Sequence, residues 1–284
     1  MTVNEAVPNF LKFVKVYNKP ATYEYYKQYL RYISDFIGNI EVASLNRDVV
    51  LNMILEKQKQ NPNISNTTLN KYIGVTQTLY KHVMQKDLDV RKLKQRVPET
   101  KIISNQTINR VFDYYDKRKY DRTDYRNYVY FSLSLDTGLR LNEMLNIKVS
   151  NIDFENNTIF VDVTKTDKDR TVVFTNRTAT LLKVFILVYH QNYEYLFMNY
   201  IGKKRLSSSS VESVVTALKA KLKIKEDFYP HAWRHTFATN FIKKGGNVVL
   251  LKELMGHSNL KTTQKYLHLG KDDLIKGYID PYFA

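Results

Sequence analysis

Two stretches in the second half of the chain set an arginine beside another polar side chain at helical spacing. "DTGLRLNEML" places Arg140 just after a glycine that is expected to end a helix, and Glu143 follows three residues later on the same face. "HAWRHTFAT" places His231 and Arg234 one helical turn apart. A guanidinium group binds phosphate through two parallel hydrogen bonds and keeps its charge at every ordinary pH. These residues are therefore suited to surround a pentavalent phosphate on which negative charge accumulates.

Two further stretches add a lysine and a tyrosine to this set. "VTKTDKDRTVVF" is expected to contain the turn of a β-hairpin and to project Lys165 from its tip. "GHSNLKTTQKY" places His257 nine residues before Tyr266. A tyrosine hydroxyl attacks well only when its proton is removed or its developing charge is stabilised, so a nearby histidine is needed. A lysine whose pKa is lowered by neighbouring cations can protonate a departing alkoxide. Together these residues supply what is needed to break a phosphodiester without a metal.

Each of these residues has a simpler interpretation when it is taken alone. An arginine with a glutamate three residues on is usually a surface ion pair, a lysine in a turn is usually solvated, and Tyr266 is one of 22 tyrosines. His231 and His235 lie four residues apart, which would suit a metal, but Arg234 lies between them and a fixed cation opposes metal binding. Only the combination points to one reaction, and for that reaction we expect no metal and no cofactor.

The order of these motifs resembles the tyrosine recombinase (phage integrase) family over about residues 100–270. The stretches "TGLR", "RHTFAT" and "GHSNLKTTQKY" carry the resemblance, and their order and spacing agree with one another. Trp233 stands where the family more often has leucine, and we expect this to be a packing change outside the catalytic positions. The two-domain layout is similar to Xer-like recombinases and to resolvases encoded by transposons and plasmids.

The resemblance implies a role for each residue of the set. Arg140 and Arg234 would clamp the scissile phosphate, and Tyr266 would attack it to form a 3′-phosphotyrosine and release a 5′-hydroxyl. Lys165 would protonate that leaving oxygen. Because the phosphotyrosine conserves the energy of the broken bond, the resemblance implies neither ATP nor a metal.

Three other residues would support these four. His231 would act as an acid or base near the nucleophile, and His257 would hydrogen-bond a phosphate oxygen. Glu143 would orient the surroundings of the first arginine.

The elements that must position these residues are mostly helical. "VRKLKQRVPETK" is charged, contains a proline and has no apolar periodicity, which predicts a linker at 91–103. It would join a helical DNA-binding domain at 1–90 to a catalytic domain at 104–284. In the second domain, apolar periodicity predicts a β-hairpin around 158–174 and helices at about 104–117, 123–137, 177–190, 208–222, 231–244, 247–255 and 259–268. The expected fold class is mainly α with a small antiparallel β-sheet: an N-terminal helical bundle of the core-binding, SAM-like type and an α+β catalytic domain.

The first 90 residues predict four packed helices. An aromatic stripe at Tyr25, Tyr29, Tyr32 and Phe36 and an apolar stripe within 69–83 each follow one helical face, and both are expected to face the core. The opposite faces carry four candidates for contact with DNA phosphates: Lys27, Arg31, Lys71 and Lys81.

The composition agrees with a nucleic-acid partner. The formal net charge is +16 and the pI is near 9.6, and both predicted domains share the excess, which favours a chain that holds DNA with both. The absence of cysteine excludes disulfides, zinc fingers and thiol catalysis. The N-terminus lacks the pattern of a signal peptide, and the apolar stretch "LLKVFILVYH" is too short to cross a bilayer, so we expect a cytoplasmic protein.

The resemblance also implies an assembly: a homo-tetramer that exchanges strands between two double-stranded DNA sites through a Holliday junction. We favour resolution of cointegrates or multimers for a bacterial mobile element, a transposon or a plasmid. The alternatives are an integrase or excisionase, a nicking and closing enzyme like type IB topoisomerases, and an inactive DNA-binding regulator. The tail at 270–284 is expected to pack on a neighbouring copy or on its own domain. The sequence leaves open the target site, the directionality, the accessory proteins, and cleavage by Tyr266 in its own site or a neighbour's.

Overall fold

The chain divides into two units, Met1–Pro98 and Glu99–Ala284, and each has its own hydrophobic core. The structure is a computed structural model that describes residues 1–95, 100–162, 169–190, 193–201, 203–257, 261–264 and 266. Lys165 and the tail 270–284 lie outside these residues, so what the sequence predicts for them stays a prediction. The two units are described one at a time.

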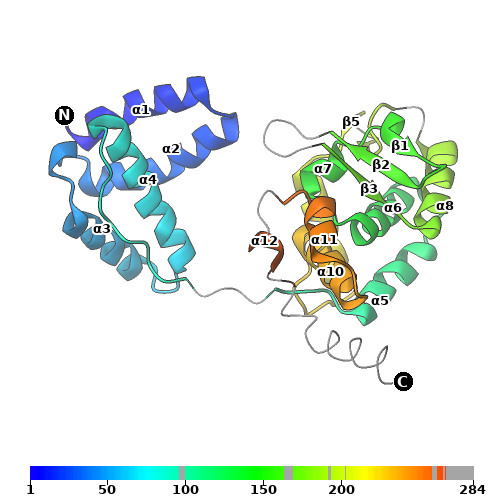
Figure 1. Ribbon diagram of the computed structural model, residues 1–284. Coiled ribbons are helices and arrows are strands. Elements are labelled where there is room, and N and C mark those ends of the chain that lie inside the picture. The colour runs from blue at the N-terminus through cyan, green and yellow to red at the C-terminus, as the bar shows by residue number, and fades with distance from the viewer. Residues whose placement is uncertain are drawn as a thin grey trace. The chain divides into compact units, whose positions relative to one another are not determined.

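Four helices form the first unit: α1 (Val3–Tyr17), α2 (Pro20–Ile37), α3 (Arg47–Gln60) and α4 (Asn66–Met84), with a short 3-10 turn, η1 (Val42–Ser44), between α2 and α3 (Figure 1). Each begins where the sequence satisfies the free N–H groups of a first turn. Thr2 and Glu5 form a capping box on α1, and Asn46 and Ser65 cap α3 and α4 with their side-chain oxygens. Pro20, which has no N–H to satisfy, opens α2.

Aliphatic side chains provide most of the core face of α2. Leu30 and Ile33 are fully buried, whereas Tyr25 and Phe36 of the predicted aromatic stripe are 37% and 39% exposed. Tyr29 is the one member of that stripe that is buried. The prediction was therefore wrong for Tyr25 and Phe36, because the aliphatic stripe beside them takes the inner face. The rings of Tyr25 and Phe36 lie along its edge instead.

The helix α4 buries the stripe predicted for it, at Leu69, Ile73 and Leu79. The chain that follows runs back along this helix. The side-chain amide of Asn70 donates to the Leu93 carbonyl at 2.9 Å, and its oxygen accepts from the Leu93 N–H at 2.7 Å. The start of the predicted linker is therefore packed on the first unit.

The second unit is also mainly helical (Figure 1). Its helices are α5 (Asn105–Asp116), α6 (Arg122–Thr137), α7 (Leu141–Leu145), α8 (Asn176–Val184), α9 (Ser208–Lys221), α10 (Pro230–Lys243), α11 (Val248–Met255) and α12 (Lys261–Gln264), with a 3-10 turn η2 (Val149–Asn151) and a π-helical turn η3 (Phe185–Tyr189) that extends α8. Ser104 caps α5, near the start of the helix predicted at about 104–117, by accepting from the Thr107 N–H. Just before it, the N–H of Ile103 donates to Thr236 Oγ1 at 2.8 Å, so the end of the predicted linker packs on this unit. No helix within the described residues has the length and apolar character needed to cross a membrane.

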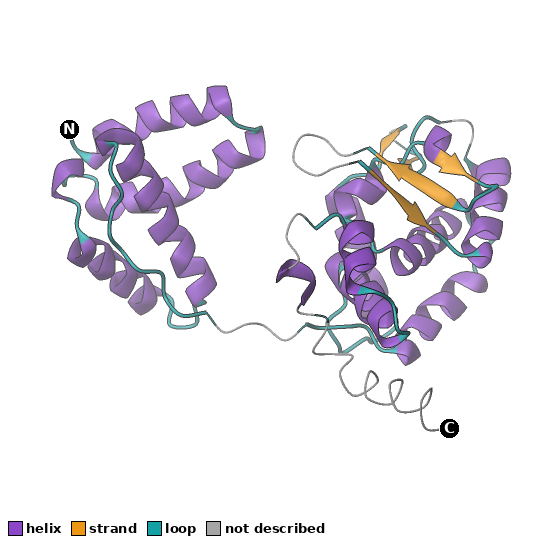
Figure 2. Ribbon diagram, viewed as in Figure 1, coloured by secondary structure: helices purple, strands orange, loops and turns teal. Residues whose placement is uncertain are grey.

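Two small antiparallel sheets complete the second unit (Figure 2). The strands β1 (Ile152–Asp153), β2 (Thr158–Val161) and β3 (Arg170–Val173) pair in that order, and β4 (Met198–Asn199) pairs with β5 (Lys204–Arg205). The predicted hairpin is formed by β2 and β3, with Ile159 opposite Val172 and both fully buried. The observed architecture, helices with small antiparallel sheets, confirms the predicted fold class.

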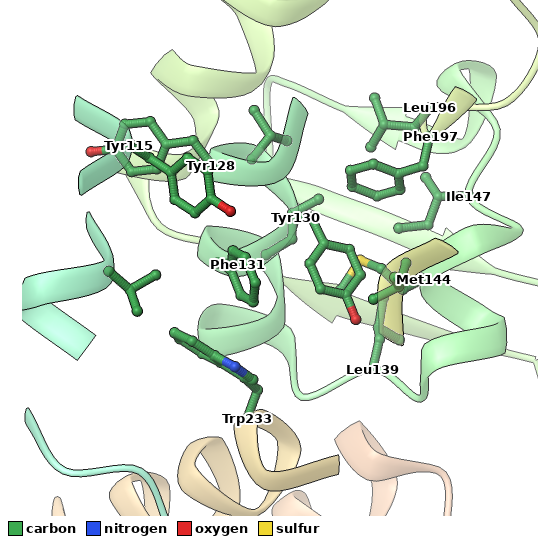
Figure 3. Close-up of a cluster of buried hydrophobic side chains, with 14 of the residues drawn as sticks. Tyr115, Tyr128, Tyr130, Phe131, Leu139, Met144, Ile147, Leu196, Phe197 and Trp233 are labelled. Carbon is green, nitrogen blue, oxygen red and sulfur yellow. The ribbon is translucent and has the colours of Figure 1, made fainter. Parts of the chain in front are cut away.

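The helix α6 lies at the centre of the second core, and every residue from 125 to 134 is buried. Figure 3 shows Phe131 of this helix beside Trp233 of α10, with ring centroids 4.9 Å apart, and Tyr115 of α5 on the same cluster. Trp233 is fully buried and therefore acts in packing, as predicted. Because α6 ends at Gly138 and α10 carries Arg234, this contact fixes the two segments that bear the predicted arginines.

Candidate active site

Arg140 is placed by the sharp end of α6. Gly138 adopts a left-handed conformation with φ of 60°, and a Cβ there would lie 2.2 Å from a ring carbon of Phe237. The chain then turns into α7, and Glu143 in the first turn of this helix accepts from Arg140, the residue before it. The backbone N–H of Arg140 donates to Glu143 Oε2 at 2.7 Å, and its Nη1 donates to Oε1 at 2.8 Å. Its Nη2 donates to the Gly256 carbonyl at 2.9 Å, which joins α7 to the end of α11.

Glu143 also binds a second arginine that the sequence analysis did not single out, Arg170 of β3. Nη1 and Nη2 of Arg170 donate to Oε1 and Oε2 of Glu143 at 3.1 and 2.7 Å. Burial raises the pKa of Glu143, but the hydrogen bonds and charges of Arg170, together with those of Arg140, outweigh burial and hold the pKa below its ordinary value. Glu143 is therefore a carboxylate at neutral pH.

Arg234 is more buried than Arg140, with a relative exposure of 5%. Its Nη1 donates to the Gly138 carbonyl and its Nη2 to the Met255 carbonyl, both at 2.6 Å. Burial, and then the charge of Arg140, lower its pKa to about 10, while Glu143 acts in the opposite direction. The group therefore remains a cation at neutral pH, held between the end of α6 and the end of α11.

His257 connects Arg234 to the segment that carries the tyrosine. Its Nε2 lies 3.1 Å from Arg234 Nη2, and its Nδ1 lies 2.8 Å from Thr263 Oγ1. Since a guanidinium group can only donate, Nε2 must be the acceptor, which assigns the proton to Nδ1 and makes Thr263 its acceptor. The carbonyl of Thr263 in turn accepts the N–H of Tyr266 at 3.0 Å.

Tyr266 packs in a small apolar cluster with residues of α10 and α11, including Leu251 and Met255, and is 1% exposed. Its hydroxyl lies 2.7 Å from Nδ1 of His235. Burial raises the pKa of Tyr266 to about 12, although the charge of Arg234 lowers it in part. The phenol is therefore protonated at neutral pH, and it can donate its hydrogen to His235 in the tautomer that carries no proton on Nδ1.

The histidine beside the phenol was expected to be His231. That residue lies one turn earlier on α10 and is exposed, whereas His235 is partly buried against Tyr266. Both had been noted in the sequence, but neither spacing nor residue type distinguished them. The two residues that sequence reasoning missed thus lie at opposite ends of the network, His235 on the tyrosine and Arg170 on the glutamate.

The structure brings five of the predicted residues into one connected network: Arg140, Glu143, Arg234, His257 and Tyr266. Among the described residues, no group of three or more histidine or acidic side chains is arranged to hold a metal ion.

The four DNA-binding candidates of the first unit are all exposed: Lys27, Arg31, Lys71 and Lys81. Lys71 and Lys81 line two neighbouring grooves that share Tyr25, Gly74 and Lys92. Lys81 also pairs with Asp87 at 2.8 Å. This face of α2 and α4 therefore combines exposed cations, a tyrosine ring and an open glycine.

Most of the second unit matches a known family. Residues 101–272 match the model of the phage integrase family, which is more than half of the chain. This chain belongs to that family. It is a tyrosine recombinase, an enzyme that cleaves and rejoins DNA strands.

Similar sequences carry the same description. The recombinase is 42% identical over 151 residues to "Tyrosine recombinase XerA" of Saccharolobus solfataricus, a match that covers 52% of this chain and 47% of the relative. It is 28% identical over 253 residues to a "Tyrosine recombinase" of Pseudothermotoga lettingae, covering 86% and 84% of the two chains.

Solved structures show the same fold at low sequence identity. The integrase of the transposon Tn1549, solved with transposon right end DNA, superposes with a TM-score of 0.81 at 17% identity and covers all of both chains. The recombinase XerH, solved with its difH substrate in a post-cleavage complex, gives a TM-score of 0.74 at 19% identity, over 91% of this chain and 79% of that one.

Proposed function

We propose that the recombinase cleaves a DNA strand with Tyr266 while Arg140 and Arg234 bind the scissile phosphate. The observation that carries this proposal is the connected network itself. The network joins three segments that are far apart in the sequence, at 138–143, 234–235 and 255–266. Hydrogen bonds lead from Arg234 to the Gly138 carbonyl and to His257, from His257 to Thr263, and from the Thr263 carbonyl to the N–H of Tyr266. A tyrosine beside one fixed cation, Arg234, and joined through the same network to a second, Arg140, is the arrangement that attack on a phosphodiester requires.

In the cleavage step, the Tyr266 oxygen forms a bond to phosphorus and the bond from phosphorus to the 5′-oxygen breaks. The phenolic proton passes to His235, because its Nδ1 lies 2.7 Å from the hydroxyl and can accept that hydrogen when it carries no proton of its own. Lys165 gives a proton to the leaving 5′-oxygen. The reverse sequence rejoins the strand, and the phosphotyrosine keeps the bond energy in between.

Three residues complete this scheme. His257 is proposed to donate a hydrogen bond to a phosphate oxygen beside Arg234. This requires a proton on Nε2, the nitrogen that accepts from Arg234 in the present structure. Glu143 is proposed to orient Arg140. His231, exposed on α10 one turn before His235, is proposed as a further acid or base at the phosphate. Because Tyr266 is 1% exposed, the segment around it must rearrange before a phosphate can reach the phenol.

A nicked duplex tests the chemistry directly. Duplexes with a randomised core are first selected for binding by the Tyr266→Phe chain, which defines the target site. The selected site is then nicked beside each candidate phosphate, so that a short leaving strand is lost and the covalent complex accumulates. The wild-type chain should form a covalent adduct that Tyr266→Phe does not form. An adduct of equal yield in that variant would assign the nucleophile to another residue.

The proposed biological role is resolution of cointegrates or multimers for a mobile element, by a homo-tetramer on two synapsed sites. The likeness to a transposon integrase and to Xer recombinases supports it. A plasmid with two direct copies of the selected site should be resolved into two circles faster than two single-site plasmids are joined. Faster joining would favour an integrase, relaxation of a plasmid without the site would favour a topoisomerase, and binding without an adduct would favour a regulator.

We further propose that the tail 270–284 packs on a neighbouring copy. It contains the apolar residues Leu274, Ile275, Tyr278, Ile279 and Phe283. A chain ending at residue 270 should bind a single site normally and fail to pair two sites. Normal recombination by the truncated chain would show that the tail is not required.

A further inference from the structure

Arg170 is the first residue of β3, and its guanidinium group is enclosed by three elements. Its Nη1 and Nη2 donate to Glu143 of α7 at 3.1 and 2.7 Å, and its Nε donates to the Leu254 carbonyl of α11 at 2.8 Å. The side chain is 8% exposed. All three nitrogens are thus used inside the unit, which makes Arg170 unsuited to bind DNA itself.

Glu143 serves Arg140 and Arg170 with the same two oxygens. Oε1 accepts from Nη1 of both arginines, and Oε2 accepts from the Arg140 backbone N–H and from Arg170 Nη2. The two cations differ in exposure, since the side chain of Arg140 is 31% exposed and that of Arg170 is 8% exposed. Arg140, Glu143 and Arg170 form a triad of two positive charges and one negative charge, so the triad carries one net positive charge. Arg140 is its more exposed cation.

We propose that Arg170 is a positioning residue for the cleavage reaction, which neutralises Glu143 from the inner side so that the charge of Arg140 acts on the DNA phosphate. This inference rests on the proposed function of Arg140. Without Arg170, Glu143 would form a neutral pair with Arg140 and compete with phosphate for its N–H groups. The attraction of the site for a phosphate would then decrease, although Arg140 itself is still present.

The surrounding backbone is built to admit this inner guanidinium group. Gly256 has φ of 59°, and a Cβ on it would lie 2.7 Å from Arg170 Nη1. The carbonyl of the same glycine accepts the hydrogen bond from Arg140 Nη2 at 2.9 Å. A larger residue at 256 would press on the guanidinium group of Arg170. The backbone that it would displace is the one whose carbonyl accepts from Arg140. The missing Cβ at Gly256 therefore allows Arg170 to pack against the same glycine that binds Arg140.

The inference is tested by restoring the charge balance. Arg170→Met removes the inner cation while keeping an apolar stem, and it should lower the single-turnover rate of adduct formation about 10- to 100-fold, the usual effect of losing a residue that orients a reactive group. Adding Glu143→Gln to Arg170→Met removes the competing carboxylate and returns the triad to one net positive charge. The double variant should therefore cleave at least several-fold faster than Arg170→Met alone, on the same nicked duplex.

Two further variants separate this role from a merely structural one. Arg170→Lys keeps the inner charge but loses the planar fork, and it should retain more activity than Arg170→Met even if it is less stable. Lys148→Met removes an exposed ion pair of similar length, 2.7 Å to Glu194, and should leave cleavage unchanged. The free energy of unfolding of each variant shows which losses arise from instability.

Binding of inorganic phosphate provides a readout that does not depend on cleavage. Titration followed by the NMR signals of the arginine Nε–H groups should give weaker affinity for Arg170→Met and recovery in the double variant. If the three chains differ in phosphate affinity as expected but the wild-type chain forms no covalent adduct, the proposed function is contradicted, whereas the effect of Arg170 on phosphate binding still stands. Equal phosphate affinity in wild type and Arg170→Met, or a double variant no better than Arg170→Met in both measurements, would overturn the role of Arg170.

Discussion

At the scale of single residues, the hydrogen bond between Tyr266 and His235 decides how the nucleophile loses its proton. His235→Phe removes the acceptor 2.7 Å from the phenol and should slow adduct formation about 10²- to 10⁴-fold, the usual contribution of a general base. Because the pKa of Tyr266 is raised to about 12, the ionised fraction of the phenol grows tenfold per pH unit below that value. The rate of the variant should therefore rise more steeply between about pH 7 and about pH 9 than the rate of the wild type.

A duplex with sulfur in place of the bridging 5′-oxygen identifies which proton transfer is lost, because a thiolate leaves without being protonated. Lys165→Ala should recover on this duplex, since its role is to protonate the leaving oxygen. His235→Phe should not recover, since its defect lies in the attacking phenol. Wild-type rates for His235→Phe on the ordinary duplex would return the role of proton acceptor to His231.

Glu143 gives the stability of the second unit a defined dependence on pH. Its pKa is held below the ordinary value in the folded chain, chiefly because the hydrogen bonds and charges of Arg170 and Arg140 outweigh the effect of burial. A carboxyl group of this kind contributes stability that is fully present above its unfolded pKa and is lost as the pH falls through the folded pKa. The free energy of unfolding should therefore fall with acidification below about pH 4.3, and Glu143→Gln should reduce this dependence. An unchanged slope in the variant would contradict the assignment.

The residues of the site could be predicted from sequence where their order along the chain was informative. Arg140 and Glu143, and Arg234 with His231, lie one helical turn apart, and His257 and Tyr266 lie in one further motif nine residues apart. His235 was not distinguished from His231, since only the packing of α10 against the tyrosine segment separates them.

Arg170 gave a weaker signal that could have been used. It lies two and four residues before Val172 and Phe174, which are both buried, so the alternation of a strand aims it inward. An arginine on the inner face of a strand needs a buried partner. The identity of that partner, Glu143, depends on contacts between distant segments.

At the scale of elements, the glycine that ends α6 should be the least replaceable residue of its turn. Gly138→Ala combines a left-handed backbone with a Cβ placed 2.2 Å from Phe237, and should lower the free energy of unfolding by about 2–4 kcal/mol. Gly74→Ala is the matched control, because Gly74 lies inside α4 with nothing within 4 Å of the added Cβ. It should stabilise the first unit by about 0.5–1 kcal/mol. Equal effects of the two changes in chemical denaturation would contradict this account.

Helices such as α5 and α6 were predictable because they combine an apolar period with a cap, at Ser104 and Gly138, whereas α7 has five residues and was not among the predicted helices. The strands β1, β4 and β5 have two residues each, which is too short for any alternation to be detected. The core face of α2 was placed on its aromatics, although the aliphatic stripe beside them packs more closely. Helix position could thus be predicted from sequence, whereas the exact face depended on the neighbouring helices.

At the scale of the whole molecule, the net charge of +16 predicts binding that weakens steeply with salt. The slope of log affinity against log salt should decrease by about one when a side chain that contacts a phosphate is removed. The variants that test this are Lys27→Ala, Arg31→Ala, Lys71→Ala and Lys81→Ala. Lys59→Ala is the control, since Lys59 pairs with Glu56 on an exposed face of α3. A slope that is unchanged in all four variants would place the DNA contacts of the first unit elsewhere.

The contact between Gly256 and Arg170 has a consequence for the evolution of such enzymes. Only a residue without a Cβ fits at 256 while an arginine occupies 170, because the added atom would lie 2.7 Å from the guanidinium nitrogen. A lineage that loses the inner arginine is released from this contact, while the left-handed φ of 59° still favours glycine at 256. A lineage that replaces the glycine must accept that backbone strain and also shorten the residue at 170. In an alignment of family members the two positions should therefore covary, and sequences that keep Arg140 and Tyr266 but have lost both should be enriched in proteins that bind DNA without cutting it.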